Sequence, residues 1–125
     1  MILDTNALSA AADDDPGVAA ILVRADQVAI PVIVLGEYRH GIAQSRHRAT
    51  YESWLAGLLN DCMVLDIQEP TTQYYTEITL ELKRKGKPIP TNDLWIAALC
   101  RQHSLPLLSR DRHFDLVVGT KRIDW

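Results

Sequence analysis

Short apolar runs alternate with longer amphipathic segments along this chain of 125 residues. The short runs predict strands at residues 1–3, 28–30, 63–67, 106–109 and 121–125. Apolar spacings of three and four, with helix-start signals, predict helices at residues 16–25, 31–43, 46–60, 70–85 and 93–103. Because strands separated by helices usually pair in parallel, the pattern predicts an α/β fold with a mainly parallel sheet.

Length and composition indicate one domain over residues 1–125, since a chain that is 47% hydrophobic can build one core without disulfides or structural metal. No repeat or linker-like tract marks a boundary. The opening residues lack a secretory pattern and no uncharged apolar stretch approaches about 18 residues. We therefore expect a cytoplasmic protein without membrane association.

The net charge and the positions of cysteines and histidines argue against several classes of protein. The net charge of -3 disfavours a protein that coats nucleic acid through charge alone. Two isolated cysteines, Cys62 and Cys100, predict reduced thiols rather than a disulfide or a zinc site. The histidines share no metal-ligand spacing, and we interpret all four as surface or packing residues: His40, His47, His103 and His113.

Two acidic residues follow predicted strands. Asp4 comes directly after the first apolar run, and Asp111 lies just beyond residues 106–109. Ligands of parallel α/β proteins usually bind at the carboxyl ends of the strands, so both carboxylates are candidates for chemistry. The alternatives are that Asp4 caps a helix and that Asp111 is an ordinary turn residue.

A third acid, Asp93, lies in the first turn of a predicted helix. Pro90 keeps the entry extended, and Thr91 or Asn92 can cap the helix. Interaction with the helix dipole is the alternative role for Asp93. The residues that follow are apolar nearly all round, which predicts a central helix and a partly buried Asp93.

Glu37 shares a predicted helix face with Ile33, Val34 and His40. A carboxylate on such a face is costly unless it is paired, protonated or bound to metal. Arg39 is only two residues away and does not share this face, so it is a poor salt-bridge partner. Glu37 is therefore the most informative acid of the chain.

Several carboxylates gathered at one edge repel one another unless a cation neutralises them. Oxygen ligands favour Mg²⁺ or Mn²⁺, and Mg²⁺ often completes its coordination shell with phosphate. The acids therefore predict metal-assisted hydrolysis of a phosphodiester.

Four ordered motifs, MILDTNALS, VIVLGEYRHGI, TNDLWIAA and LLSRDRHFDLV, resemble the PIN-domain ribonucleases, and among these the VapC-type toxins. The resemblance covers nearly the whole chain and implies a three-layer α/β/α domain with a mainly parallel central sheet. It matches Asp4, Glu37 and Asp93 to the acidic core of the family and Asp111 to a fourth acid, with Asp115 as a candidate auxiliary ligand.

The same resemblance implies an endoribonuclease that depends on Mg²⁺ or Mn²⁺ and hydrolyses transfer RNA or another structured RNA. It also implies a homodimer inhibited by a VapB-type antitoxin, with translation and growth as the processes affected. Four polar neighbours could orient carboxylates or metal-bound water, or could serve only turns and caps: Thr5, Asn6, Thr91 and Ser109.

Basic and aromatic residues give two further candidates. A basic rim beside the acids could contact RNA or be a solvated helix end: Lys83, Arg84, Lys85 and Lys87. Arg110 is a similar candidate for RNA contact, with solvated surface as the alternative. An apolar stripe indicates core packing, with a partner-binding groove as the alternative: Tyr51, Trp54, Leu55, Leu58 and Leu59.

Other functions explain less of the chain. A haloacid dehalogenase-type phosphatase needs a second Asp two positions after the first, where this chain has Asn6. A signalling receiver domain needs paired acids after the first strand and leaves Glu37 unexplained. A structure-specific DNA nuclease would need extensions that grip its substrate, and a degenerate PIN module that only binds would not need the intact acidic set.

Overall fold

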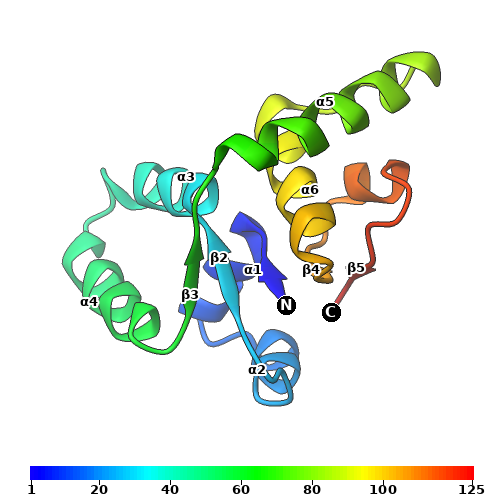
Figure 1. Ribbon diagram of the computed structural model, residues 1–125. Coiled ribbons are helices and arrows are strands. Elements are labelled where there is room, and N and C mark those ends of the chain that lie inside the picture. The colour runs from blue at the N-terminus through cyan, green and yellow to red at the C-terminus, as the bar shows by residue number, and fades with distance from the viewer.

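The computed structural model describes all 125 residues and contains one five-stranded sheet in the order β3-β2-β1-β4-β5 (Figure 1). Every neighbouring pair of strands is parallel. The strands are short: β1 Ile2–Leu3, β2 Ala29–Pro31, β3 Met63–Leu65, β4 Leu107–Leu108 and β5 Arg122–Ile123. All five lie within the predicted apolar runs or within one residue of them, and the parallel α/β prediction is confirmed.

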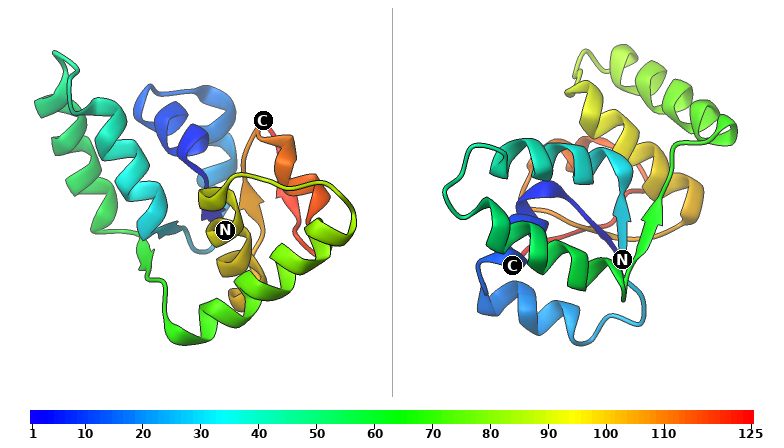
Figure 2. Two further views of the ribbon diagram at one scale, coloured as in Figure 1. Left: turned by 90° about the horizontal axis from the view of Figure 1, so that it is seen from above. Right: turned by 90° about the vertical axis from the view of Figure 1, so that its left-hand side faces the viewer.

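Six α-helices and one short 3₁₀ helix connect the strands: α1 Thr5–Ala12, α2 Pro16–Leu22, α3 Val32–Ile42, α4 Arg48–Leu59, α5 Glu69–Arg84, α6 Thr91–His103 and η1 Arg112–Leu116. Seen from above, α1 and α2 lie on one side of the strands and α5 and α6 on the other, with α3 and α4 beyond one end (Figure 2). This is the three-layer arrangement expected. None of the helices has the length and apolar character needed to span a membrane.

The core is one cluster of 26 buried residues. Ile2 and Leu3 of β1 are fully buried, as are Leu107 and Leu108 of β4, because these central strands have helices over both faces. In α4, Leu55 is fully buried and the remaining four residues of the apolar stripe pack partly buried against the core. The core-packing interpretation of that stripe is therefore confirmed.

Several helices differ from the sequence prediction. Helix α1 and the 3₁₀ helix η1 were not predicted. Helix α2 ends three residues earlier than expected, α4 begins two residues later, and α6 begins two residues earlier, at Thr91. The predicted cap of α6 by Thr91 or Asn92 is wrong, because Pro90 is the N-cap residue and no side chain makes a capping hydrogen bond. Pro90 has an extended backbone that directs the chain into the helix without such a bond.

The strand order has a reversal point between β1 and β4. From β1 the chain adds β2 and then β3 on one side, whereas β4 and β5 lie on the other side. In open parallel sheets the ligand crevice lies outside the carboxyl ends of the strands at such a point. The residues that follow β1 and β4 are therefore placed at the expected position of a functional site.

Candidate active site

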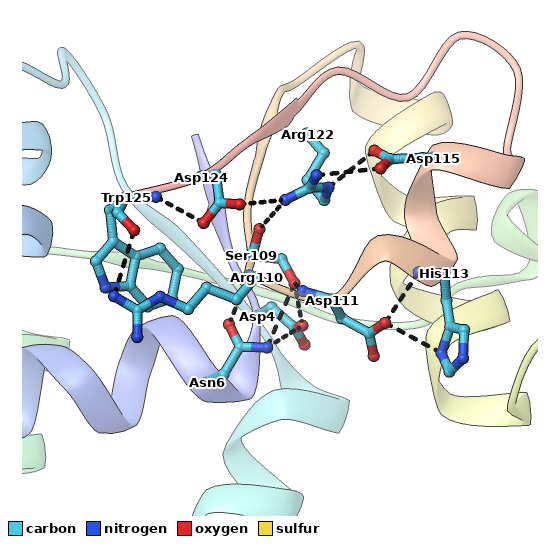
Figure 3. A network of polar contacts seen from close by, with 10 residues as sticks. All are labelled: Asp4, Asn6, Ser109, Arg110, Asp111, His113, Asp115, Arg122, Asp124 and Trp125. Atoms are coloured by element: carbon cyan, nitrogen blue, oxygen red, sulfur yellow. Dashed lines mark hydrogen bonds and ion pairs between the residues drawn. The ribbon is translucent and has the colours of Figure 1, made fainter.

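Asp4 directly follows β1 and is 5% exposed. Its Oδ1 accepts a hydrogen bond from the backbone N–H of Thr5 at 2.8 Å, so it caps α1. Its Oδ2 accepts from the Ser109 hydroxyl at 2.6 Å and from the Asn6 amide at 3.1 Å (Figure 3). The helix-cap interpretation of Asp4 is therefore confirmed, and the same carboxylate also faces the end of the neighbouring strand.

Ser109 links the ends of the two central strands. It directly follows β4 and is fully buried. While donating to Asp4, its hydroxyl oxygen accepts from the backbone N–H of Asp111 at 2.9 Å. Asn6 accepts from the backbone N–H of Arg110 at 3.2 Å. The loop that carries Asp111 is thus fixed by side chains from both strand ends (Figure 3).

Glu37 is half-buried on α3 and faces the same region. Its Oε1 accepts a hydrogen bond from the Thr5 hydroxyl at 3.0 Å. Arg39 instead lies 4.0 Å from Glu52, in agreement with the different helix faces of Glu37 and Arg39. No basic side chain pairs with Glu37, so its charge is unpaired within the chain.

Asp93 and Asp111 converge from different elements. Asp93 lies in the first turn of α6, with a side chain that is 13% exposed. Asp111 is the N-cap of η1 and accepts the backbone N–H of His113 at 2.9 Å. The Nδ1 atom of His113 lies 3.2 Å from Oδ2 of Asp93 and 3.1 Å from Oδ1 of Asp111.

His113 is exposed, which confirms its interpretation as a surface residue, and it also belongs to the acidic cluster, which the sequence did not indicate. Asp93, Asp111 and His113 each offer one ligand atom, all within 4.8 Å of one another. Spacing between histidines could not reveal this, because the partners of His113 are carboxylates. The available signal was its position two residues after Asp111, on a segment following the end of a central strand.

Burial and neighbouring negative charges raise the pKa values of two acids in the cluster, Asp4 and Asp93. Burial raises the pKa of Asp4, and the nearby Glu37 and Asp111 carboxylates raise it further against the hydrogen bonds from Ser109 and Thr5. Burial also raises the pKa of Asp93 to about 6, with Asp111 and Asp4 adding to the effect and His113 opposing it. The charged forms of Asp4 and Asp93 are therefore destabilised in the protein alone, and a bound cation would stabilise them.

The neighbouring arginines do not supply that cation. The Cζ atom of Arg110 lies 4.3 Å from the centre of the Trp125 ring, and its Nη2 atom lies 3.9 Å from Oδ2 of Asp15. Arg122 pairs with Asp115 at 2.8 Å and with Asp124 at 3.1 Å (Figure 3). No lysine or arginine pairs with any of the four clustered acids. Buried and half-buried carboxylates that have no lysine or arginine partner fit a divalent metal ion.

The remaining candidate residues do not contact the acidic cluster. Asp115 lies in the Arg122 ion pair, outside the cluster. Thr91 is exposed at the start of α6 and makes no side-chain hydrogen bond. The basic rim is exposed at the end of α5 and just beyond it, where Gly86 adopts a φ of 65°: Lys83, Arg84, Lys85 and Lys87. Contact of this rim with RNA stays a prediction.

Two hollows lie beside α3, and Glu37 and Thr5 line both of them. One measures about 650 Å³ and extends along α3 to Asn92. The other measures about 250 Å³ and lies between α1, α3 and α4, where Tyr51 and Tyr38 contribute to its wall. The larger hollow therefore runs along α3 beside one of the four acids, Glu37.

Known proteins share both the sequence pattern and this architecture. The family profile described as "PIN domain" matches residues 1–119. Ribonuclease VapC2 of Rickettsia felis is 35% identical over 78 residues, covering 62% of this chain and 58% of that protein. Ribonuclease VapC5 of Mycobacterium tuberculosis is 26% identical over 106 residues, covering 79% of this chain and 75% of that protein.

Among solved structures, VapBC2 from Rickettsia felis, bound to a DNA fragment from their promoter, superposes with a TM-score of 0.86. The identity is 27%, and the match covers 99% of this chain and 97% of that chain. The likeness therefore extends over the whole arrangement of strands and helices that positions the acids.

Proposed function

This chain belongs to the PIN domain family, and from that premise we propose that it is a metal-dependent endoribonuclease of the VapC type, with residues 1–125 forming a single PIN domain. The observation that carries the proposal is the convergence of Asp4, Glu37, Asp93 and Asp111 at the reversal point of the sheet, where none of them pairs with a lysine or arginine. Relatives that carry the name ribonuclease VapC support RNA as the substrate.

The proposed metal ligands are Asp4, Asp93 and Asp111, with Glu37 as a ligand or as a proton acceptor. A bound Mg²⁺ or Mn²⁺ supplies Lewis-acid stabilisation of charge on the phosphate and lowers the pKa of water. Ser109 and Asn6 orient the Asp4 carboxylate through their hydrogen bonds. The donor set is thereby fixed before substrate arrives.

Glu37 is the proposed acceptor of a proton from the attacking water. Its Oε1 is held by the Thr5 hydroxyl, while Oε2 has no hydrogen-bond partner in the chain. Because Glu37 lines the hollow along α3, this oxygen is accessible to a phosphodiester bound there. Thr5 then has a defined role, which is to hold the carboxylate while leaving one oxygen free.

We also propose a VapB-type antitoxin as the partner and a homodimer as the assembled toxin. The structural relative is a VapBC complex, which supports pairing of the toxin with an antitoxin. In this assembly the chain is the toxin, and RNA cleavage inhibits translation and growth. Transfer RNA or another structured RNA is the proposed target.

RNA cleavage by the isolated protein tests this function. Protein freed of antitoxin is incubated with total RNA and Mg²⁺ or Mn²⁺, beside Asp4→Asn and the exposed control Asp61→Asn. We expect Asp4→Asn to lower the cleavage rate at least about 100-fold, because loss of a metal ligand exceeds loss of an outer-shell contact. Asp61→Asn retains the wild-type rate.

Equal cleavage by wild type and Asp4→Asn would contradict the mechanism. Addition of EDTA must abolish cleavage, and comparison of Mg²⁺ with Mn²⁺ identifies the preferred ion. Single-stranded DNA of the same sequence is included as a substrate, since preferential DNA cleavage would favour a DNA nuclease. Absence of cleavage with intact metal binding would favour a binding module.

A further inference from the structure

We propose that His113 binds the active-site metal through Nδ1, which gives the site mixed oxygen and nitrogen ligands and a preference for Mn²⁺ over Mg²⁺. The inference rests on the proposed function, because it concerns the metal held by the same acids. It adds one ligand that the pattern of acidic residues does not predict.

The separations around Nδ1 match those between ligands of one ion. Ligand atoms about 2.1 Å from an octahedral metal lie about 3 Å apart when they are adjacent. Nδ1 of His113 lies 3.2 Å from Oδ2 of Asp93 and 3.1 Å from Oδ1 of Asp111. The imidazole nitrogen thus has the spacing of a third ligand atom beside the two carboxylate oxygens, and Figure 3 shows its contact with Asp111.

The backbone fixes His113 in this position. Asp111 caps η1 by accepting the His113 N–H, so the two residues move together. Phe114, the next residue, is fully buried and anchors η1 in the core. Although the His113 side chain is 50% exposed, the segment that carries it is held from both sides.

Hydrogen bonding alone satisfies this arrangement poorly. A neutral imidazole has at most one proton on Nδ1, whereas two carboxylates approach that atom. A metal ion among the three groups accepts electron pairs from both oxygens and the nitrogen. The competing explanation is an ion pair between a protonated His113 and the two acids, and the experiment below separates the two.

Ligand chemistry predicts which metal ion binds more tightly when His113 is a ligand. Mg²⁺ favours oxygen ligands and keeps several waters, whereas imidazole binds the later transition metals more strongly. Mn²⁺ accepts oxygen ligands as readily as Mg²⁺ does, and it lies at the beginning of the series in which nitrogen ligands increase affinity. A nitrogen ligand from His113 therefore stabilises bound Mn²⁺ more than bound Mg²⁺.

Electron spin echo spectroscopy of the Mn²⁺-loaded protein tests for the bond directly. Wild-type protein with ¹⁵N-labelled histidine should show modulation from a nitrogen nucleus bound to Mn²⁺, and His113→Ala should lose it. The control His47→Ala retains the modulation, because His47 is exposed before α4 and its side chain makes no capping hydrogen bond.

Calorimetric titration with Mn²⁺ and Mg²⁺ gives the second readout. In His113→Ala we expect the Mn²⁺ dissociation constant to rise at least about tenfold. The Mg²⁺ constant should change less, so the preference for Mn²⁺ narrows. Thermal unfolding without metal verifies that the variant is folded.

The outcomes distinguish this inference from the proposed function. Mn²⁺ binding by wild type without a nitrogen signal, or with a signal that persists in His113→Ala, overturns the role of His113 and leaves the carboxylate site intact. Failure of wild type to bind either ion overturns both. Loss of the signal together with a narrowed metal preference in His113→Ala supports the inference.

Discussion

Ser109 is a small residue with a large structural role. Its hydroxyl donates to Asp4 at 2.6 Å and accepts from the backbone of Asp111 at 2.9 Å. A single buried oxygen therefore joins two of the proposed metal ligands, which are 107 positions apart in the sequence. Because the hydroxyl is inaccessible to water, its loss cannot be compensated by solvent.

Replacing this hydroxyl should destabilise the protein. We expect Ser109→Ala to lower the free energy of unfolding by about 1–3 kcal/mol, since the half-buried N–H of Asp111 and the buried carboxylate of Asp4 each lose a partner. Urea denaturation followed by circular dichroism measures the change. Ser9→Ala is the matched control, because Ser9 on α1 makes no side-chain hydrogen bond. An equal effect in both variants would contradict the bridging role.

The acids and the histidine differ in how far sequence could predict them. Asp4 follows an apolar strand and Glu37 lies on an apolar helix face, so each is conspicuous in its own local pattern. His113 stands in a polar segment, and its importance depends on the position of Asp93, which lies on another element. Only tertiary structure brings those two residues together.

At the scale of elements, α5 and α6 are held together by a charged and an aromatic contact. Arg101 on α6 donates to both carboxylate oxygens of Glu81 on α5 at 3.0 Å. It also donates to the carbonyl of Val118 at 2.9 Å. Tyr75 and Trp95 stack with ring centres 4.0 Å apart. These contacts fix the helix that presents Asp93.

The Arg101–Glu81 pair predicts a pH-dependent contribution to stability. The hydrogen bonds from Arg101 hold the pKa of Glu81 below its usual value. This carboxyl therefore contributes stability above its unfolded pKa and loses that contribution as pH falls through its lowered folded pKa. Glu81→Gln should be less stable than wild type at pH 7 by roughly 1 kcal/mol or less, because the pair is partly exposed.

Urea denaturation of wild type and Glu81→Gln across pH 2.5 to 7 measures this effect, and their difference should shrink toward the acid end. Asp61→Asn serves as the exposed control, since Asp61 forms no ion pair. A difference between wild type and Glu81→Gln that is constant with pH would indicate lost packing rather than lost charge.

Helix α1 shows where element prediction fails. Its sequence, TNALSAAA, has one large apolar residue, Leu8, and otherwise small or polar side chains. Such a segment is short and offers a single large apolar side chain to the core, although Ala7 and Leu8 are both fully buried. The cap from Asp4 and the packing of α1 against neighbouring helices establish the helix, and neither is visible in local periodicity.

For the whole molecule, the parallel sheet was predictable because its strands are almost entirely apolar. The strand order was not, since apolar runs carry no information about their neighbours. Resemblance to PIN-domain ribonucleases supplied the expectation of layers that periodicity alone could not. The order matters for the site, because the neighbouring positions of β1 and β4 bring Asp4 to Ser109.

Metal binding should stabilise the whole domain. A ligand that binds only the folded state adds about 2.7 kcal/mol to the free energy of unfolding at one hundred times its dissociation constant. We therefore expect Mg²⁺ or Mn²⁺ to raise the midpoint of thermal unfolding and EDTA to reverse the rise. Asp4→Asn should show a smaller rise, while the control Asp61→Asn behaves like wild type.

If millimolar metal leaves the midpoint of thermal unfolding of the wild-type protein unchanged, the shared metal site is contradicted. A rise of equal size in Asp4→Asn would instead place the bound ion elsewhere. Calorimetric scanning at matched ionic strength separates specific binding from screening of surface charges.

The bond between Ser109 and Asp4 spans 105 positions of the chain. A chain still emerging from the ribosome presents Asp4, Glu37 and Asp93 before it presents Ser109, Asp111 and His113. The proposed catalytic centre is therefore incomplete until synthesis has passed β4 and η1. An enzyme that cleaves RNA used in translation would thus stay inactive until the ribosome has synthesised the chain through η1.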